Sequence, residues 1–107
     1  MFKITHQDGK ARVGKLKTAH GTIETPFFMP VATRASGKYI TTDDYKTIPA
    51  KAIISNSFLL SLKPGIKTME KAGGIHHFMN FNKVIFTDCG GFQMSRNIFI
   101  KKSKKGL

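Results

Sequence analysis

The chain has 107 residues, of which 40% are hydrophobic and 22% charged, a composition typical of a packed domain and not of a disordered chain. This length allows one modest hydrophobic core, so we expect a single domain or part of one. Lys and Arg number 18 against 6 acids, giving a net charge of +12. Such an excess predicts attraction to polyanions such as RNA, although a lysine-rich surface also serves solubility alone.

Cysteine content and hydropathy exclude several classes of protein. Cys89 is the only cysteine, so no internal disulfide forms and no cysteine partner stands at metal-ligand spacing. The neighbours His76 and His77 diverge in regular structure, and we expect no metal site. No segment approaches the roughly 20 apolar residues that cross a bilayer, and the amino end lacks the apolar block of a secretion signal. We therefore expect a cytoplasmic protein with no membrane partner.

The first predicted elements, in residues 1–26, are short strands. Polar and apolar residues alternate here, and the pairs Asp8-Gly9 and His20-Gly21 are turn signals. The pattern predicts a small antiparallel β meander. From residue 27 to residue 93 the pattern changes to strand, helix, strand, helix, strand. The apolar run 27–31 is the first of these strands, although Pro30 cannot donate a backbone hydrogen bond to a sheet.

A helix and a buried strand are predicted next. Thr41 is a suitable N-cap, and the acids that follow it favour the first turn of a helix running through Tyr45 and Ile48. The β-branched run 52–56 then predicts a buried strand.

The second helix and the third strand complete this unit. Pro64 is suited to the first turn of a helix, and Gly73-Gly74 is suited to its end. The apolar run 84–86 predicts the third strand, which leads directly into Asp88 and two glycines. Residues 94–107 are predicted as a basic tail cut before a further strand, and its lysines at 101–105 fit either a nucleic-acid arm or a solvated loop.

Strands that alternate with helices imply a parallel sheet with right-handed crossovers. Three strands do not close a barrel, because a parallel barrel of eight strands takes about 250 residues. The predicted fold class is α/β: an incomplete (β/α)8 TIM barrel, with its first three parallel strands preceded by the meander. Residues 1–107 would then form a single partial domain that a partner or further chain completes.

The carboxyl ends of the predicted strands are where we expect chemistry, because the loops of a parallel barrel converge there. Asn56 ends the second strand and Asp88 follows the third. If these strands are neighbours, the Asn56 amide donates to the Asp88 carboxylate and holds its orientation. An alternative remains open at each position. An Asp shortly before two glycines is also typical of a turn, Phe92 fits a core, and Asn56 suits a loop.

Several separated blocks occur in an order that points to one enzyme family. They are residues 11–14, 18–31, 53–57, 62–65 and 72–79, and the motif Thr87-Asp88-Cys89-Gly90-Gly91-Phe92-Gln93. With these blocks the chain resembles the amino-terminal portion of the tRNA-guanine transglycosylases, also called queuine tRNA-ribosyltransferases. The similarity covers most of this chain but only the opening part of a complete family member.

The resemblance implies a pentosyltransferase of the queuosine pathway that exchanges guanine at the tRNA anticodon wobble position for a 7-deazaguanine base. In the family an aspartate attacks the anomeric carbon of the ribose and forms a covalent intermediate. That aspartate, and the cysteines and histidine that hold zinc in complete members, have no counterpart in residues 1–107. The chain is therefore expected to lack a cofactor and to be inactive alone. Its expected partners are tRNA, the 7-deazaguanine base, and the remainder of the enzyme or a homologous subunit.

The resemblance also assigns roles to individual residues. Asp88 matches the aspartate that moves protons to and from the base, a task that requires a carboxyl within hydrogen-bond reach. Phe92 matches an aromatic residue that stacks on the base. The other matched substrate-binding positions are Asn56 beside the acid, the polar neighbour Gln93, and Gly90 and Gly91, which would let backbone approach the ligand.

Two departures from the family pattern leave other functions open. Cys89 stands where serine is usual, and Leu59 stands where many relatives carry histidine. Because a thiol is a weaker hydrogen-bonding group than a hydroxyl, base binding is expected to be altered. The alternatives are a non-catalytic tRNA-binding subunit, which the basic charge favours, and a decayed gene fragment.

Overall fold

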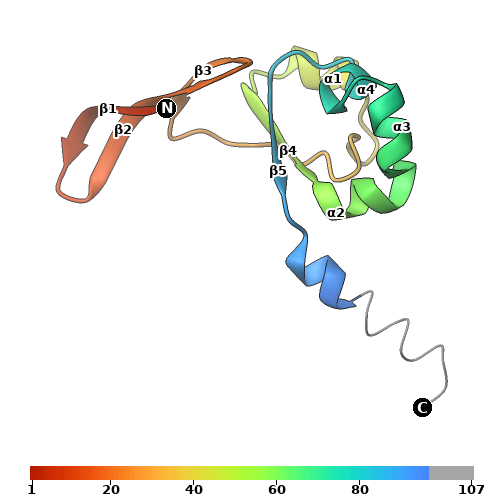
Figure 1. Cartoon of the computed structure of the whole chain (residues 1–107). Helices are drawn as coiled ribbons and strands as arrows, with labels where there is room; N and C mark the ends of the chain where they lie inside the picture. Colours follow the sequence, from red (N-terminus) through yellow and green to blue (C-terminus); the bar gives the residue numbers. More distant parts are fainter. Residues whose placement is uncertain (97–107) are drawn as a thin grey trace.

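A computed structural model of the chain describes residues 1–96 (Figure 1). An antiparallel sheet is followed by an α/β unit in which short helices pack on two parallel strands. Within residues 1–96, no helix combines the length and apolar character needed to cross a bilayer. The lysines at 101–105, predicted as part of the basic tail, lie outside the described residues.

The antiparallel sheet confirms the predicted meander. It contains β1 (Phe2–Asp8), β2 (Ala11–Thr18) and β3 (Gly21–Thr25), paired in that order. The tight turns, at residues 8–11 and 18–21, contain the expected pairs Asp8-Gly9 and His20-Gly21. Every residue of β1 is exposed, so this strand is held mainly by its hydrogen bonds to β2.

Two contacts join the sheet to the α/β unit, beside which it extends (Figure 1). Ile23 of β3 is buried in a cluster with Ala52 and Val84. The imidazole ring of His20, in the turn between β2 and β3, stacks on that of His76, with centroids 3.6 Å apart and planes 12° from parallel. One apolar contact and one ring stack therefore connect the two parts.

The parallel strands β4 (Ala52–Asn56) and β5 (Val84–Asp88) pair in register from Ala52 opposite Val84 to Asn56 opposite Asp88. Alternate side chains point to opposite faces of a sheet. Ile53 therefore packs into a core beneath the helices, whose buried members are Ala32, Ala35, Tyr45, Ile53, Leu60, Met79 and Phe81. Ala52 and Val84 instead face the cluster around Ile23. Both faces of the pair are thus covered in part.

The predicted first parallel strand, residues 27–31, is reduced to an isolated bridge between Val31 and Ile54. The segment still runs beside β4, since the Ala32 N–H donates to the Ile54 carbonyl and the Ile54 N–H donates to that of Pro30. Pro30 has no N–H to donate in return, which interrupts a regular ladder. The prediction of three parallel strands was therefore wrong. The described residues contain two parallel strands, β4 and β5, and one segment bridged to β4.

The helix α1 (Thr42–Thr47) begins at the predicted N-cap. The Thr41 hydroxyl accepts a hydrogen bond from the Asp44 N–H, and the Asp44 carboxylate accepts one from the Thr41 N–H at 2.6 Å. These hydrogen bonds from the Thr41 backbone and hydroxyl hold the pKa of Asp44 below its ordinary 3.8. Tyr45 anchors the helix, since it is buried and its hydroxyl donates to the Val31 carbonyl at 2.6 Å.

The second helical region is more divided than predicted. It contains α2 (Ser57–Leu60), η1 (Ser61–Gly65), α3 (Ile66–Lys71) and a further helix, α4 (Ile75–Met79). Pro64 lies inside η1 and does not begin α3, because the next residue, Gly65, has the non-helical angles φ 96° and ψ 155° and is the N-cap of α3. Gly73 and Gly74 end α3 as predicted, both with positive φ and with N–H groups donating to Glu70 and Met69.

Candidate functional site

The carboxyl ends of β4 and β5 bring Asn56 and Asp88 together. The two residues are the last pair of the parallel ladder, and the Asn56 Nδ2 donates to the Asp88 Oδ2 at 3.2 Å. Asn56 is 4% exposed, whereas Asp88 is exposed at the end of β5. The predicted contact is therefore present, and it leaves the carboxylate open to a molecule arriving from solvent.

The oxygen of the Asn56 side-chain amide also takes part in a hydrogen bond. Its Oδ1 accepts from the Leu59 N–H at 2.8 Å, which makes Asn56 the N-cap of α2. Because oxygen and nitrogen of the amide have different partners, only one orientation satisfies both. The start of α2 therefore determines which group faces Asp88.

Ser57 makes a further contact that the assignment of site residues missed. This first residue of α2 donates its hydroxyl hydrogen to the backbone carbonyl of Asp88. A hydroxyl directly after the last residue of a parallel strand was visible in the sequence. Its partner was not, because it depends on the register between β4 and β5.

Gly90 packs directly on the Asn56 side chain. A Cβ at residue 90 would lie 2.7 Å from the Asn56 Oδ1 and 2.9 Å from the Phe58 Cβ, and the backbone has φ +67°. Both the space and the conformation therefore require glycine. The structure thus gives Gly90 a packing role against Asn56. The expected approach of its backbone to a ligand stays a prediction. Gly91 is different, with nothing within 4 Å of a Cβ.

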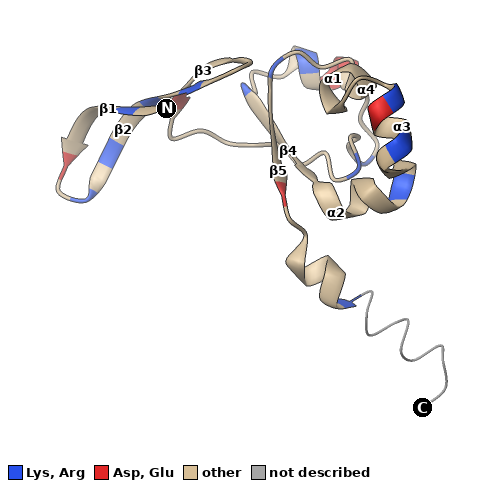
Figure 2. Cartoon of the chain, viewed as in Figure 1, with Lys and Arg blue, Asp and Glu red and all other residues tan. Residues whose placement is uncertain are grey.

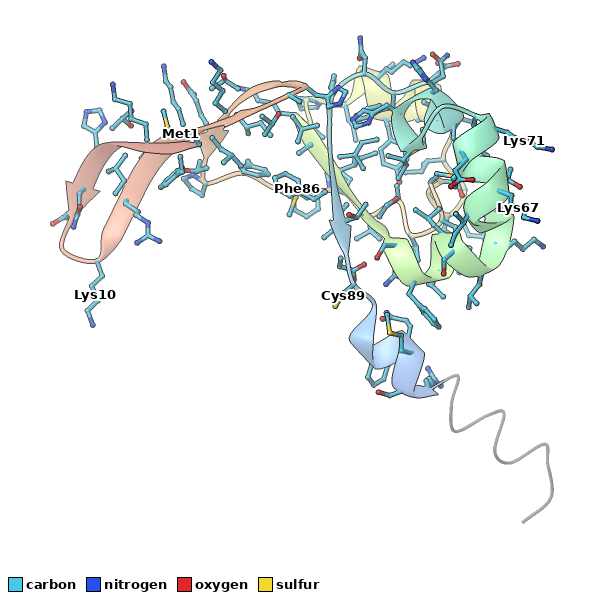
Figure 3. The ribbon with its side chains drawn as sticks, viewed as in Figure 1. Met1, Lys10, Lys67, Lys71, Phe86 and Cys89 are labelled. Atoms are coloured by element: carbon cyan, nitrogen blue, oxygen red, sulfur yellow. The ribbon has the colours of Figure 1, made fainter. Side chains whose placement is uncertain are left out.

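The remaining predicted residues lie on the helical turn formed by residues 91–96. This turn follows β5 directly, and Cys89 marks the junction (Figure 3). Phe92 is 72% exposed, and Gln93 is partly buried. Contacts therefore connect Asn56 with Asp88 and with Gly90. Phe92 and Gln93 are close to Asp88 in sequence and lie on the helical turn that follows it.

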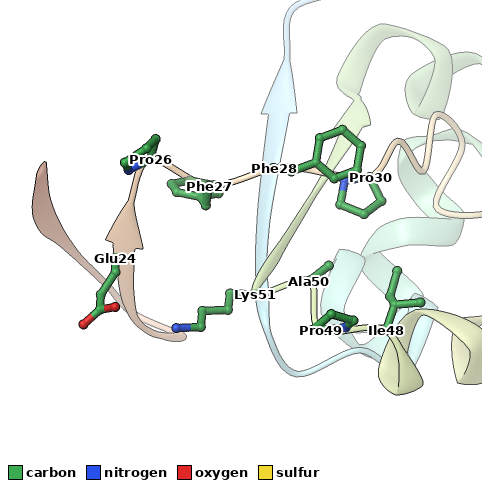
Figure 4. A pocket seen from close by; sticks show the side chains of 9 residues that line it. All are labelled: Glu24, Pro26, Phe27, Phe28, Pro30, Ile48, Pro49, Ala50 and Lys51. Carbon is green, nitrogen blue, oxygen red and sulfur yellow. The ribbon is translucent and has the colours of Figure 1, made fainter. Parts of the chain in front are cut away.

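An apolar hollow lies at the other end of β4. It has a volume of about 450 Å³ and is walled by Phe27, Phe28 and Pro30 on one side and Ile48, Pro49 and Ala50 on the other (Figure 4). Lys51, which precedes β4, also lines it. Since Asn56 and Asp88 are at the opposite end of the parallel strands, this hollow is separate from the candidate site.

A metal does not fit the residues near Asp88. Within residues 1–96, no cluster of three or more His, Cys, Asp or Glu side chains is placed to hold an ion. Cys89 is a free, exposed thiol. The chemistry of this site is therefore derived from its carboxylate, its amide and its backbone.

Comparison with known proteins identifies the family. The sequence model described as Queuine tRNA-ribosyltransferase matches residues 7–106. The chain belongs to this family. Curated queuine tRNA-ribosyltransferases are 50% identical over 95 residues in Halothermothrix orenii and 54% identical over 95 residues in Caldanaerobacter subterraneus subsp. tengcongensis. Another, from Thermoanaerobacter pseudethanolicus, is 47% identical over 109 residues.

The match covers most of this chain but a small part of each queuine tRNA-ribosyltransferase. The shares are 87% of the chain and 26% of the Halothermothrix protein, and 87% and 25% for the Caldanaerobacter protein. For the Thermoanaerobacter protein they are 99% and 29%. The chain therefore spans about a quarter of the length of these curated relatives, and it matches their amino-terminal portion.

Proposed function

We propose that this chain is the amino-terminal part of a tRNA-guanine transglycosylase, which exchanges guanine at the anticodon wobble position of tRNA for a 7-deazaguanine base. Its membership of the family supports the proposal, since the matched relatives are named queuine tRNA-ribosyltransferases. The reaction class is transfer of a pentosyl group from one base to another, in the queuosine pathway and in the cytoplasm.

The single observation that carries the proposal is the placement of Asp88. Its carboxylate lies at the carboxyl end of a parallel strand, exposed and held on one side by the Asn56 amide at 3.2 Å. A carboxylate held in this way is able to accept and return a proton at a nitrogen of a heterocycle. We assign that role to Asp88.

Other residues would hold the base beside this acid. Phe92, which is exposed, offers an aromatic face on which a base released from a nucleic-acid stack can rest. Gln93 and the backbone at Gly91 would contribute polar contacts, while Gly90 keeps Asn56 in place. These positions form the recognition part of the site.

The proposal also covers the fold and the catalytic and zinc-binding residues for which residues 1–107 have no counterpart. The bridged segment 30–33, β4 and β5 would begin a (β/α)8 barrel whose further strands carry the attacking aspartate and the zinc ligands. Nothing in residues 1–107 matches the motif of that nucleophile. The chain alone should therefore bind but not exchange bases.

A hybrid enzyme tests this assignment. In it, residues 1–96 of this chain replace the matching amino-terminal segment of the Halothermothrix orenii relative. The hybrid should incorporate labelled guanine into tRNA, and Asp88→Ala should abolish incorporation. Full exchange after Asp88→Ala, or an inactive hybrid beside an active parent, would contradict the proposal.

The charge distribution favours a second candidate function, a non-catalytic subunit that binds tRNA. Figure 2 shows basic residues on both the antiparallel sheet and α3, while one ion pair, Lys46 with Asp43, is present within residues 1–96. Most of the positive charge is therefore free to meet phosphates. Tight, salt-dependent binding of tRNA by the 107-residue chain, together with an inactive hybrid, would favour this function over catalysis.

A further inference from the structure

Ser57 holds the main chain of Asp88 by a bond that the parallel ladder does not supply. The ladder ends with the pair Asn56 and Asp88, because the chain turns into α2 at Ser57. At this point the Ser57 hydroxyl donates to the Asp88 carbonyl. A side chain thus extends the connection between the two strands by one residue, at the place where the backbone of β4 has already left the sheet.

The hydroxyl is not needed for two simpler purposes. It does not cap α2, since the Asn56 Oδ1 already accepts from the Leu59 N–H at 2.8 Å. Burial does not force the hydroxyl to find a protein partner either, since Ser57 is exposed and water can accept its hydrogen bond. The hydrogen bond to the Asp88 carbonyl is therefore the contact that remains to explain the Ser57 hydroxyl.

Two contacts from one short segment then fix Asp88 at two points. The Asn56 amide binds the carboxylate, and the Ser57 hydroxyl binds the carbonyl of the same residue. The bond to the carbonyl restricts the orientation of the Asp88 main chain, and the bond from the amide restricts the rotation of its carboxylate. The same carbonyl leads into Cys89 and Gly90, where the backbone packs on Asn56.

We propose that Ser57 is a positioning residue, which aligns Asp88 for proton transfer to the base through the hydrogen bond between its hydroxyl and the Asp88 carbonyl. This inference rests on the proposed function of Asp88. It adds the start of α2 to the site.

The test compares Ser57→Ala, Ser57→Thr and Ser61→Ala in the hybrid enzyme. Ser61 is a matched control, because it is exposed, lies one turn further along, and donates its hydroxyl to the Phe58 carbonyl at 2.7 Å without contacting Asp88. Ser57→Ala should lower kcat about tenfold with little change in the KM for guanine, as expected when a reacting group is slightly misplaced. Ser57→Thr, which keeps the hydroxyl, should restore kcat, and Ser61→Ala should leave it unchanged.

A second measurement follows the hydrogen bond itself. The amide nitrogen of Cys89 is bonded to the Asp88 carbonyl carbon, so its NMR shift reports whether that carbonyl accepts a hydrogen bond. The shift should change in Ser57→Ala and return in Ser57→Thr. No change would overturn the inference, and so would a loss of kcat that follows a lowered melting temperature and is not restored by threonine.

The outcomes separate this inference from the proposed function. If Asp88→Asn abolishes exchange while Ser57→Ala keeps full kcat, Ser57 does not position the acid and the proposed function stands. If exchange survives Asp88→Asn, the proposed function fails. The Cys89 amide shift then decides alone whether Ser57 holds Asp88.

Discussion

The side-chain amide of Asn56 joins two structures that are separate in sequence, since its nitrogen donates to Asp88 at 3.2 Å and its oxygen accepts from the N–H of Leu59 at 2.8 Å. One residue therefore caps a helix and orients the candidate acid. A change at this position affects stability through the cap and activity through the acid. Suitable substitutions can separate these two effects.

Asn56→Asp should impair exchange but keep the cap of α2. Aspartate keeps an oxygen that accepts from the Leu59 N–H, and Asp is as good an N-cap as Asn. It loses the donor to Asp88 and places a second carboxylate beside it, which repels the first. Asn56→Ala should lose the cap as well, at a cost of about 1 kcal/mol. Guanine exchange of the hybrid enzyme measures the effect on activity, and hydrogen exchange of the Leu59 amide, which donates to the Asn56 Oδ1, measures the cap. Equal loss of protection at Leu59 in the two variants would contradict this account.

Gly90→Ala and Gly91→Ala should differ sharply, although the two glycines are adjacent. A methyl group at residue 90 would lie 2.7 Å from the Asn56 Oδ1 on a backbone with φ +67°, whereas nothing lies within 4 Å of one at residue 91. Gly90→Ala should therefore cost about 1–3 kcal/mol and displace Asn56 from Asp88. Gly91→Ala should change stability by less than about 0.5 kcal/mol. Chemical denaturation tests this order, and similar losses would show that residue 90 can relax.

The stack of His20 on His76 should make the contact between the sheet and α4 sensitive to acid. Burial lowers the pKa of His76 below its ordinary 6.5, and the neighbouring charges of His20 and His77 lower it further. A hydrogen bond between the His76 Nε2 and the Lys83 carbonyl raises this pKa, but by less than the other effects lower it. His76, His77 and Lys46 of α1 line one hollow of about 490 Å³.

The sign of the effect follows from this lowered pKa. Above pH 6.5, His76 is neutral in both folded and unfolded chains, and the stability is at its full value. As the pH falls below 6.5 towards the lower folded value, the unfolded chain binds the proton first, so stability decreases. NMR titration of the His76 ring measures the folded pKa. His20→Phe keeps a ring without a charge and should raise it, and an unchanged value would contradict the proposed coupling.

Acid should also weaken α1, through a different group. The pKa of Asp44 is lowered by its hydrogen bonds to Thr41, so its stabilisation is complete above pH 3.8 and is lost as the pH falls through the folded value. Asp44→Asn should remove this dependence, whereas Asp43→Asn should leave it, because Asp43 takes no part in the capping box. Hydrogen exchange of the Ile48 amide, which donates to the Asp44 carbonyl at 3.2 Å, follows the helix.

The 107-residue chain by itself should associate through its exposed apolar surface. Phe28 is 79% exposed and Val31 is 61% exposed, in the segment beside the hollow at the amino end of β4. Such surface normally marks a contact with another part of a protein. Phe28→Ser with Val31→Thr should reduce association in sedimentation experiments. The hybrid enzyme, in which further chain is present, should associate less than the 107-residue chain.

Features that depend on neighbouring residues could be predicted from the sequence. The meander turns at Asp8-Gly9 and His20-Gly21, the N-cap Thr41 and the glycines after α3 all rest on side chains or backbone freedom within a few positions. The parallel strand at residues 52–56 was found for a similar reason, since it begins with the apolar run Ala52-Ile53-Ile54. The segments at 27–31 and after Asn56 were predicted less well, because Pro30 and Pro64 alter the backbone there.

Sequence alone determined the family blocks, the basic charge and the presence of Asp88 and Asn56 at the ends of two strands. Only the tertiary structure decided that these strands are neighbours in a register that brings the amide to the carboxylate, that Ser57 reaches the Asp88 carbonyl, and that Gly90 packs on the Asn56 side chain. The physical reason is distance along the chain. Caps and turns form between residues a few positions apart. Contacts between residues 56 and 88 exist only after the helices between β4 and β5 have packed and brought the two strands together.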